Sequence, residues 1–252
     1  MKTNAGQSVP NGVARGRVVA GTLYILASAA CFGSMAIFAR MAYASGVDVP
    51  TLLLFRFTIA AILMWTLLLA KGMKLPRGKG MVMLVAMGAL GYAGQAFSFF
   101  TALTLASAGL VSLLLYLYPA IVAILARLVF RHPLSRFQIA AVVVALLGSV
   151  LTIGKAGDGK PLGIFFGLLC AFIYSVYILA GSRFPKDVTP TASTTVITSS
   201  AAVAYACVVL FKGYHPPGTG TGWMAVAAIA VICTVLAILF FFEGLERVGA
   251  VR

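Results

Sequence analysis

The sequence has few of the residues on which enzyme chemistry usually depends. Its 252 residues include only two histidines, His132 and His215, which lie far apart in expected loops. The four cysteines all fall within apolar stretches and form no CxxC pair: Cys31, Cys170, Cys207 and Cys233. A buried free cysteine commonly behaves as a small apolar residue. Because no metal-binding motif, catalytic triad or phosphate-binding loop is recognisable, the sequence predicts no metal, no cofactor and no enzyme activity.

Acidic residues are also scarce, with five against 19 lysines and arginines, which gives a net charge of +14. They fall in expected loops or at the end of the last apolar stretch: Asp48, Asp158, Asp187, Glu243 and Glu246. No acid therefore lies in the middle of an apolar stretch. Because a cation held at membrane depth needs a compensating partner, this absence argues against a proton-driven exporter of cationic drugs. It favours a neutral, zwitterionic or anionic ligand.

Apolar residues are abundant instead, at 62% of the chain with a mean hydropathy of +1.05. They form eight long stretches, at approximately 18–42, 51–70, 81–102, 107–128, 137–154, 161–181, 190–211 and 222–242. An α-helix needs about 20 apolar residues to cross a bilayer, whereas barrel strands would appear as shorter alternating segments. The sequence therefore predicts an all-α integral membrane protein with about eight spans.

The first apolar stretch has an alternative interpretation as a cleaved signal peptide. Lys2, Arg15 and Arg17 precede it, which is typical of such signals. The stretch continues to about Ala42, however, and seven more follow. We therefore expect a membrane span there, preceded by a tail of residues 1–17.

The basic residues are distributed unevenly between the two ends of the expected spans. If the N-terminus is cytoplasmic, 13 of the 19 fall on the cytoplasmic side and four on the other, with Arg56 inside a span and Arg252 at the end. This bias follows the positive-inside rule. The surplus charge is therefore explained by insertion in a lipid bilayer, as a multi-pass protein of the cytoplasmic membrane with its N-terminus in the cytoplasm. It does not indicate a nucleic-acid partner.

The chain resembles itself when it is shifted by 142 residues. Phe99 and Phe100 then coincide with Phe241 and Phe242, and Gly21 coincides with Gly163. Near the second stretch the offset becomes 140, where Pro50-Thr51 meets Pro190-Thr191. The sequence therefore predicts two copies, at 18–154 and 161–252. Because the first copy has five spans, an odd number, the second copy enters the membrane from the opposite side, as in the inverted repeats of secondary transporters.

The second copy is shorter than the first. Arg252 corresponds to Leu110, so the counterpart of residues 111–154 is missing. We therefore expect two inverted-topology five-helix repeats with ten membrane helices, of which about eight are present in this chain. A mature protein with eight helices is the alternative.

Three stretches of the chain resemble the drug/metabolite transporter superfamily, specifically its EamA type with two five-helix repeats. They are ACFGSMAIFAR at 30–40, LLLFRFTIAAIL at 52–63, and residues 99–151, in which the following positions match the family pattern: Ala102, Leu103, Ser107, Pro119, Leu134, Ser135 and Gly148. One departure is that Arg131-His132 stands where the family usually has Gly-Glu.

The resemblance implies a secondary transporter that exports small metabolites such as amino acids. It also implies a central cavity between the repeats that opens alternately to each side. The alternatives are a multidrug or cation efflux antiporter and a non-transporting membrane receptor or scaffold. A homodimer is also left open.

Arg56 is the strongest single candidate for a ligand-binding residue. It lies within the second apolar stretch, in LLLFRFTIA. An ionised side chain inside the hydrocarbon is costly and usually faces the bundle interior. We expect it to hold an anion or carboxylate, although extension of the side chain to the outer headgroups is an open alternative because arginine has a long apolar stem.

The remaining candidates are polar or aromatic residues at helical spacing within other stretches. We expect a shared polar cavity to include Gln95, Tyr116 and Tyr174 in particular. The candidate cavity residues besides Arg56 are Ser34, Gln95, Ser98, Ser112, Tyr116, Tyr174 and Tyr177. Packing between helices is the alternative role for each of them. Pro119 is expected to kink the fourth span, because proline removes a backbone hydrogen bond.

Overall fold

The computed structural model describes residues 11–130, 159–182 and 188–249, together with positions 140, 143, 144, 147 and 148. Within these residues the chain is helical and contains no strand. Seven helical segments are long and apolar enough to cross a membrane: Gly16–Ala44, Val49–Ala70, Lys79–Leu105, Ala108–Leu128, Pro161–Gly181, Pro190–Lys212 and Gly220–Val248. They correspond to seven of the eight predicted stretches and confirm an all-α integral membrane protein. The predicted stretch 137–154 lies largely outside the described residues.

Several spans are built from more than one helix. The elements before residue 131 are α1 (Asn11–Gly33), α2 (Met35–Ala44), α3 (Val49–Ala70), α4 (Lys79–Ala86), η1 (Met87–Tyr92), α5 (Ala93–Leu105), α6 (Ala108–Leu115) and α7 (Tyr118–Phe130). Those after residue 158 are α9 (Pro161–Gly181), α10 (Pro190–Lys212), α11 (Gly220–Ala230), η2 (Val231–Leu236) and α12 (Ala237–Gly249). The elements η1 and η2 are π-helical turns, each inside a long span.

Helix starts are marked by side chains that satisfy free backbone N–H groups. The Asp48 carboxylate accepts from the Thr51 backbone N–H at 3.1 Å, and Pro50 occupies the first turn of α3. Hydroxyls of Ser107, Thr189 and Thr219 act in the same way at α6, α10 and α11. Such caps stabilise helix ends because the first N–H groups have no partner within the helix.

The fourth span is interrupted next to its proline. Helix α6 ends at Leu115 and α7 begins at Tyr118, so Tyr116 and Leu117 separate them just before Pro119. The Leu117 N–H donates to the Leu114 carbonyl, a tighter turn than the α-helical one. This break allows the axis of α7 to differ in direction from the axis of α6.

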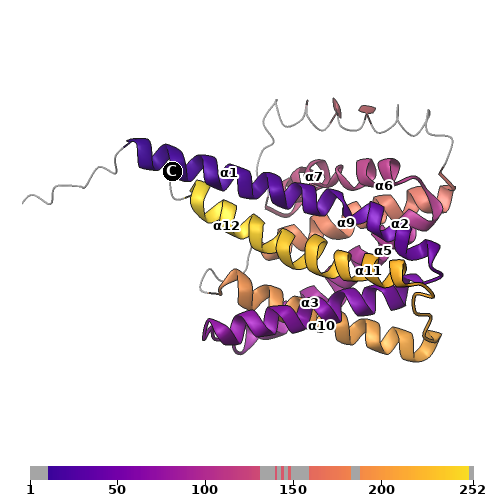
Figure 1. Cartoon of the computed structure of the whole chain (residues 1–252). Helices are drawn as coiled ribbons and strands as arrows, with labels where there is room; N and C mark the ends of the chain where they lie inside the picture. The colour runs from indigo at the N-terminus through magenta and orange to yellow at the C-terminus, as the bar shows by residue number, and fades with distance from the viewer. Residues whose placement is uncertain are drawn as a thin grey trace, which may run out of the picture.

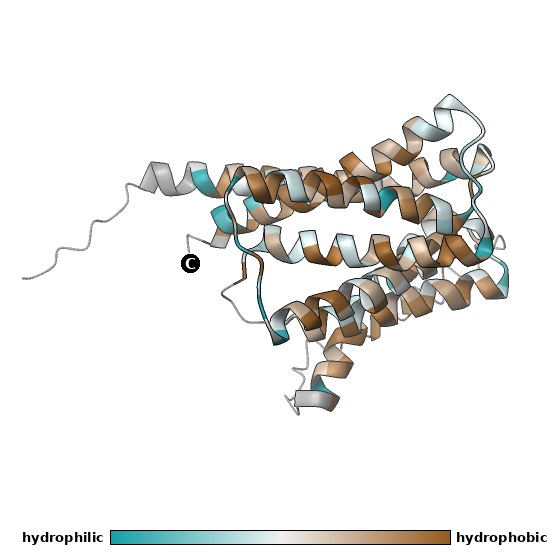
Figure 2. Ribbon diagram, turned by 90° about the horizontal axis from the view of Figure 1, so that it is seen from below, coloured by the Kyte–Doolittle hydropathy of each residue, from teal (hydrophilic) through white to brown (hydrophobic). Residues whose placement is uncertain are grey.

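The long helices pack in antiparallel pairs. Figure 1 shows α1 alongside the α11–α12 span and α3 alongside α10. A third pair joins α5 to α9. Figure 2 shows mainly apolar ribbon along the helices, with hydrophilic residues concentrated in the turns at their ends. Large apolar side chains point outward, as Leu90 and Leu210 do at 75% and 83% exposure. An apolar outer surface of this kind suits a lipid environment.

Two of these pairs have closely equivalent contacts. A Cβ on Gly21 of α1 would lie 2.9 Å from Arg247 Cβ and 2.8 Å from Val248 Cγ2 of α12. A Cβ on Gly163 of α9 would lie 2.9 Å from Leu105 Cβ, at the end of α5. The three positions Gly163, Arg247 and Val248 are each 142 residues after Gly21, Leu105 and Ala106.

A second equivalence involves hydrogen bonds. The Ser28 hydroxyl donates to the Ala237 carbonyl at 2.7 Å, between α1 and α12. Gln95 Nε2 donates to Cys170 Sγ at 3.3 Å, between α5 and α9. Cys170 and Ala237 lie 142 residues after Ser28 and Gln95. The same position of each helix pair therefore carries a polar contact.

The helices α1 and α9 run in opposite directions. The span α1–α2 ends near the end of α5, as the hydrogen bond from Arg40 Nη2 to the Ala106 carbonyl at 2.9 Å shows. Helix α9 begins at this same end of the bundle, where the Lys160 N–H donates to the Leu105 carbonyl at 3.1 Å. One span therefore finishes where the other starts.

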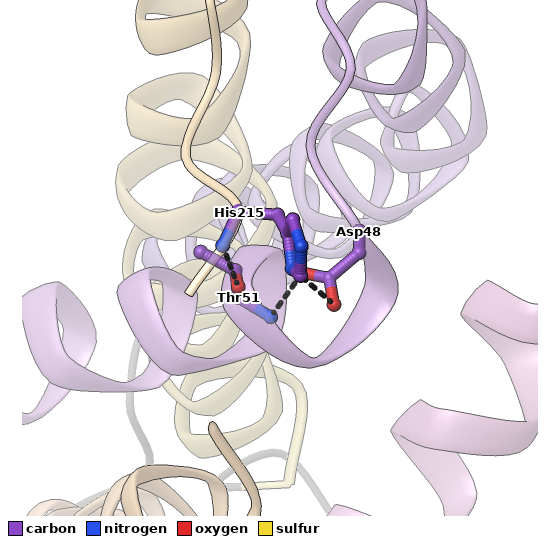
Figure 3. Close-up of polar contacts among 3 residues, drawn as sticks. All are labelled: Asp48, Thr51 and His215. Atoms are coloured by element: carbon purple, nitrogen blue, oxygen red, sulfur yellow. Dashed lines mark hydrogen bonds and ion pairs between the residues drawn. The ribbon is translucent and has the colours of Figure 1, made fainter. Parts of the chain in front are cut away.

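The connection between α10 and α11 is attached to the start of α3. The His215 backbone N–H donates to Thr51 Oγ1 at 3.2 Å, and the Gly218 N–H donates to the Ser45 carbonyl at 2.8 Å. Figure 3 shows His215 above the first turn of α3, with its Nδ1 3.7 Å from an Asp48 oxygen. Because the imidazole is 63% exposed, the backbone bonds carry most of this attachment.

We predict that Gly21→Val destabilises the protein and that Gly16→Val does not. The added side chain at Gly21 meets α12 at less than 3 Å, whereas nothing lies within 4 Å of a Cβ on Gly16. Overpacking of this kind costs about 1–3 kcal/mol. The measurement is thermal unfolding of the purified protein in detergent. Equal melting temperatures for the two variants would contradict the close packing of α1 on α12.

Candidate substrate-binding site

Arg56 lies in the interior of the bundle. It is 3% exposed and follows the start of α3 by seven residues, about 10 Å of helix rise. Its Nε donates to Thr234 Oγ1 at 2.9 Å, and its Nη2 donates to the Tyr92 hydroxyl at 3.2 Å. The side chain therefore turns toward neighbouring helices. It does not extend along its own helix to the headgroups, which was the alternative from the sequence.

Aromatic rings surround the guanidinium. Its central carbon lies 5.0 Å from the ring centroid of Phe57, 5.3 Å from that of Phe100 and 5.8 Å from that of Tyr92. Cation–π attraction of this kind is strongest where water is excluded. The rings reduce the cost of burying the charge, but they do not neutralise it.

Within the described residues no carboxylate contacts Arg56. Asp48 caps α3 and lies near His215. Glu243 accepts from Arg247 Nη2 at 2.7 Å, on the exposed surface of α12. A buried charge normally has an opposite charge as its partner. The site is therefore suited to an anionic group brought by a ligand.

Both π-helical turns meet at Arg56. Tyr92 is the last residue of η1, and Thr234 lies within η2. A π-helical turn inside an α-helix is uncommon and is frequent at functional sites. Neither residue was predicted from the sequence, because no periodicity reveals a π-helical turn. For Thr234, the one available sequence signal was that its hydroxyl stands alone in the apolar segment VICTVL.

A row of tyrosines extends away from Arg56. The ring centroids of Tyr92 and Tyr177 are 6.0 Å apart, those of Tyr177 and Tyr174 are 6.3 Å apart, and those of Tyr174 and Tyr118 are 4.9 Å apart. This tyrosine row (Tyr92, Tyr177, Tyr174 and Tyr118) spans η1, α9 and α7. It includes two predicted candidates, whereas the predicted Tyr116 is 67% exposed. Tyr118 contacts Tyr174 in its place.

Tyr177 also borders an apolar pocket of about 300 Å³ between α4, η1 and α9. Met83, Met87 and Ile173 line it, and a Cβ on Gly91 would lie 3.1 Å from the Tyr177 ring. One side of the tyrosine row is therefore open to an apolar space of molecular size.

The other predicted residues make local or interhelical hydrogen bonds. Gln95 contacts Cys170, as described above. The Ser98 hydroxyl donates to the Gly94 carbonyl of its own helix at 2.9 Å, and the Ser34 hydroxyl donates to the Cys31 carbonyl at 2.9 Å. Ser112 is half-buried on α6. The structure therefore groups Tyr174 and Tyr177 with Arg56 through Tyr92, and it places Gln95 at a helix–helix contact.

Metal-ligating side chains do not cluster in the part of the chain that the structure describes. No group of three His, Cys, Asp or Glu residues there is arranged to hold an ion. The site consists of one guanidinium, hydroxyls and aromatic rings.

Long apolar helices in antiparallel pairs define a multi-pass membrane protein, in which Arg56 is a buried cation that no acid contacts among the described residues. The chain belongs to the EamA-like transporter family. The family model matches it twice, at residues 19–154 and 161–252.

Individual relatives are named as transporters. Uncharacterized transporter YyaM of Bacillus subtilis (strain 168) is 30% identical over 77% of this chain and 68% of its own length. Uncharacterized transporter YcbK of the same organism is 25% identical over 92% of this chain and 79% of its own length. The aromatic amino acid exporter YddG of Ancylobacter novellus is 28% identical over 64% of this chain and 58% of its own. A solved crystal structure is similar with a TM-score of 0.66 and 26% identity, over 92% of this chain and 81% of its own.

We predict that Tyr205→Phe lowers the thermal stability. Tyr205 is 4% exposed, stacks on Phe57 at 5.7 Å and donates its hydroxyl to the Ala93 carbonyl at 2.7 Å, just after η1. Loss of such a buried bond costs about 1 kcal/mol or somewhat more.

The measurement is the melting temperature in detergent, with Tyr174→Phe as the matched control. Tyr174 makes its described contacts through its ring, so its variant is expected to melt close to wild type. A Tyr205→Phe protein that melts with wild type would show that the hydroxyl does not support the start of α5.

Proposed function

We propose that the protein is a secondary transporter that exports small carboxylate-bearing metabolites, amino acids among them, by alternating access. The observation that carries this proposal is Arg56. It is a buried cation with two hydroxyl partners and three aromatic neighbours, and no acid contacts it among the described residues. A carboxylate is the common metabolite group that complements a guanidinium best.

Alternating access is supported by the arrangement of the two copies. Residues 18–154 and 161–252 carry equivalent close contacts at Gly21 and Gly163, and α1 and α9 run in opposite directions. Inverted repeats allow one copy to rock against the other around a fixed central site. Arg56 of the first copy contacts Thr234 of the second, so the proposed site lies where the copies meet.

An aromatic substrate is supported by two observations. The tyrosine row begins at Arg56 and provides ring faces on which a flat group can stack. In addition, one relative is named as an aromatic amino acid exporter. The proposed substrate class is therefore carboxylates with an aromatic side group, such as aromatic amino acids.

The cation antiporter is the weaker candidate. The acids of the described residues, Asp48, Glu243 and Glu246, lie near the ends of the spanning segments. A cation site at membrane depth would need one of them nearer to the centre. Insertion in the cytoplasmic membrane, with the N-terminus in the cytoplasm, is proposed from the distribution of basic residues.

We predict that Arg56→Gln strongly reduces transport of carboxylates. The protein is reconstituted into liposomes, and flux of L-phenylalanine, benzoate and phenethylamine is measured. Wild type should move the two carboxylates and discriminate against the amine. Loss of charge-assisted hydrogen bonds costs about 1.5–3 kcal/mol, which corresponds to roughly 10- to 100-fold in apparent affinity.

Lys212→Gln is the charge-matched control, because Lys212 is exposed in the last turn of α10. It should transport as wild type does. Preferred transport of phenethylamine by wild type, or equal carboxylate flux in Arg56→Gln and wild type, would refute the proposed carboxylate site.

A further inference from the structure

The two hydroxyls at Arg56 differ in what they can still donate. The Thr234 hydroxyl donates its proton to the Ile229 carbonyl at 2.9 Å and accepts from Arg56 Nε at 2.9 Å. A hydroxyl has one proton, so Thr234 has none left for a ligand. The Tyr92 hydroxyl accepts from Arg56 Nη2, and arginine is only a donor. Its own proton therefore remains available to an anion.

The bond to Nε also determines which edge of the guanidinium a ligand can use. Of the five N–H donors of an arginine, the one on Nε is engaged by Thr234 and one on Nη2 by Tyr92. The donors left over are all on the two Nη atoms. One of these atoms, Nη2, is bonded to the Tyr92 hydroxyl, which is itself part of the tyrosine row.

We propose that Thr234 is the positioning residue of this anion site and that Tyr92 is a direct ligand contact. Thr234 binds no substrate; it holds the guanidinium in the orientation that a carboxylate needs. The inference rests on the proposed function, because it assumes that Arg56 binds the substrate.

The π-helical turn η2 makes this arrangement dependent on both copies. Thr234 belongs to the second copy and Arg56 to the first, and the Thr234 hydroxyl is oriented by the carbonyl of Ile229, five residues earlier at the end of α11. If the second copy moves away from α3, Arg56 loses its partner at Nε. The affinity for a carboxylate then falls without any change in the residues that touch the ligand. The site is thereby tight in one arrangement of the copies and weak in another, which transport requires.

The test measures binding of benzoate and of L-phenylalanine to the full chain purified in detergent, by the ligand-dependent rise in melting temperature. Thr234→Val keeps the shape of the side chain and removes the acceptor at Nε. We expect its dissociation constant for both carboxylates to rise about tenfold, which corresponds to ~1.4 kcal/mol. Thr234→Ser retains the hydroxyl and should bind within about twofold of wild type.

The matched control is Thr198→Val. Thr198 is fully buried in α10, and its hydroxyl donates within its own helix, to the Thr194 carbonyl at 2.8 Å. This variant should bind as wild type does. Tyr92→Phe, which removes the free proton, should also weaken binding about tenfold. A general packing defect would weaken binding in Thr198→Val as well and would not be rescued by Thr234→Ser.

The outcomes separate this inference from the proposed function. If Arg56→Gln abolishes binding while Thr234→Val binds as wild type does, the carboxylate site stands and the positioning role is overturned. The role is equally overturned if Thr234→Ser is as weak as Thr234→Val. If wild type binds neither carboxylate, the proposed function fails and the inference fails with it.

Discussion

A positive charge buried between two π-helical turns is the constraint on which the rest of this structure depends. Arg56 is 3% exposed and has only hydroxyl and aromatic partners among the described residues. Such a charge is tolerated at membrane depth only if neighbouring groups stabilise it or a ligand neutralises it. The rings of Phe57, Phe100 and Tyr92 give partial stabilisation. The rest of the stabilisation of the Arg56 charge would come from an anion, and this links the fold to the proposed substrate.

Close helix packing brings these groups together. Glycine at 21, 88 and 163 lets backbones approach to distances at which a Cβ would collide with a neighbouring helix. In a lipid environment, small residues of this kind let helix backbones approach closely enough to pack. The contact at Gly88, against Ile197 of α10, fixes η1 and with it Tyr92. The groups around Arg56 are therefore positioned by packing at a distance from the charge itself.

The sequence predicted the membrane fold well, because hydropathy and length alone identify a spanning helix. Seven of the eight stretches agree with described helices. The site was predicted less completely. Arg56 stood out as a charge in an apolar stretch, and Tyr174 and Tyr177 as a spaced pair. Thr234 and Tyr92 were not predicted, because they reach Arg56 from π-helical turns, which shift the register of a helix locally. The sequence left Gln95 open between a cavity residue and a contact between helices, and its amide bonds to Cys170 between α5 and α9.

The most direct test of the central claim is an experimental structure of the protein with 4-iodobenzoate, whose iodine can be located independently of the protein. The account predicts the carboxylate within hydrogen-bond distance of the Arg56 Nη atoms and the Tyr92 hydroxyl, with the iodine directed along the tyrosine row. Iodine located elsewhere, with Arg56 still bonded only to Tyr92 and Thr234, would contradict it.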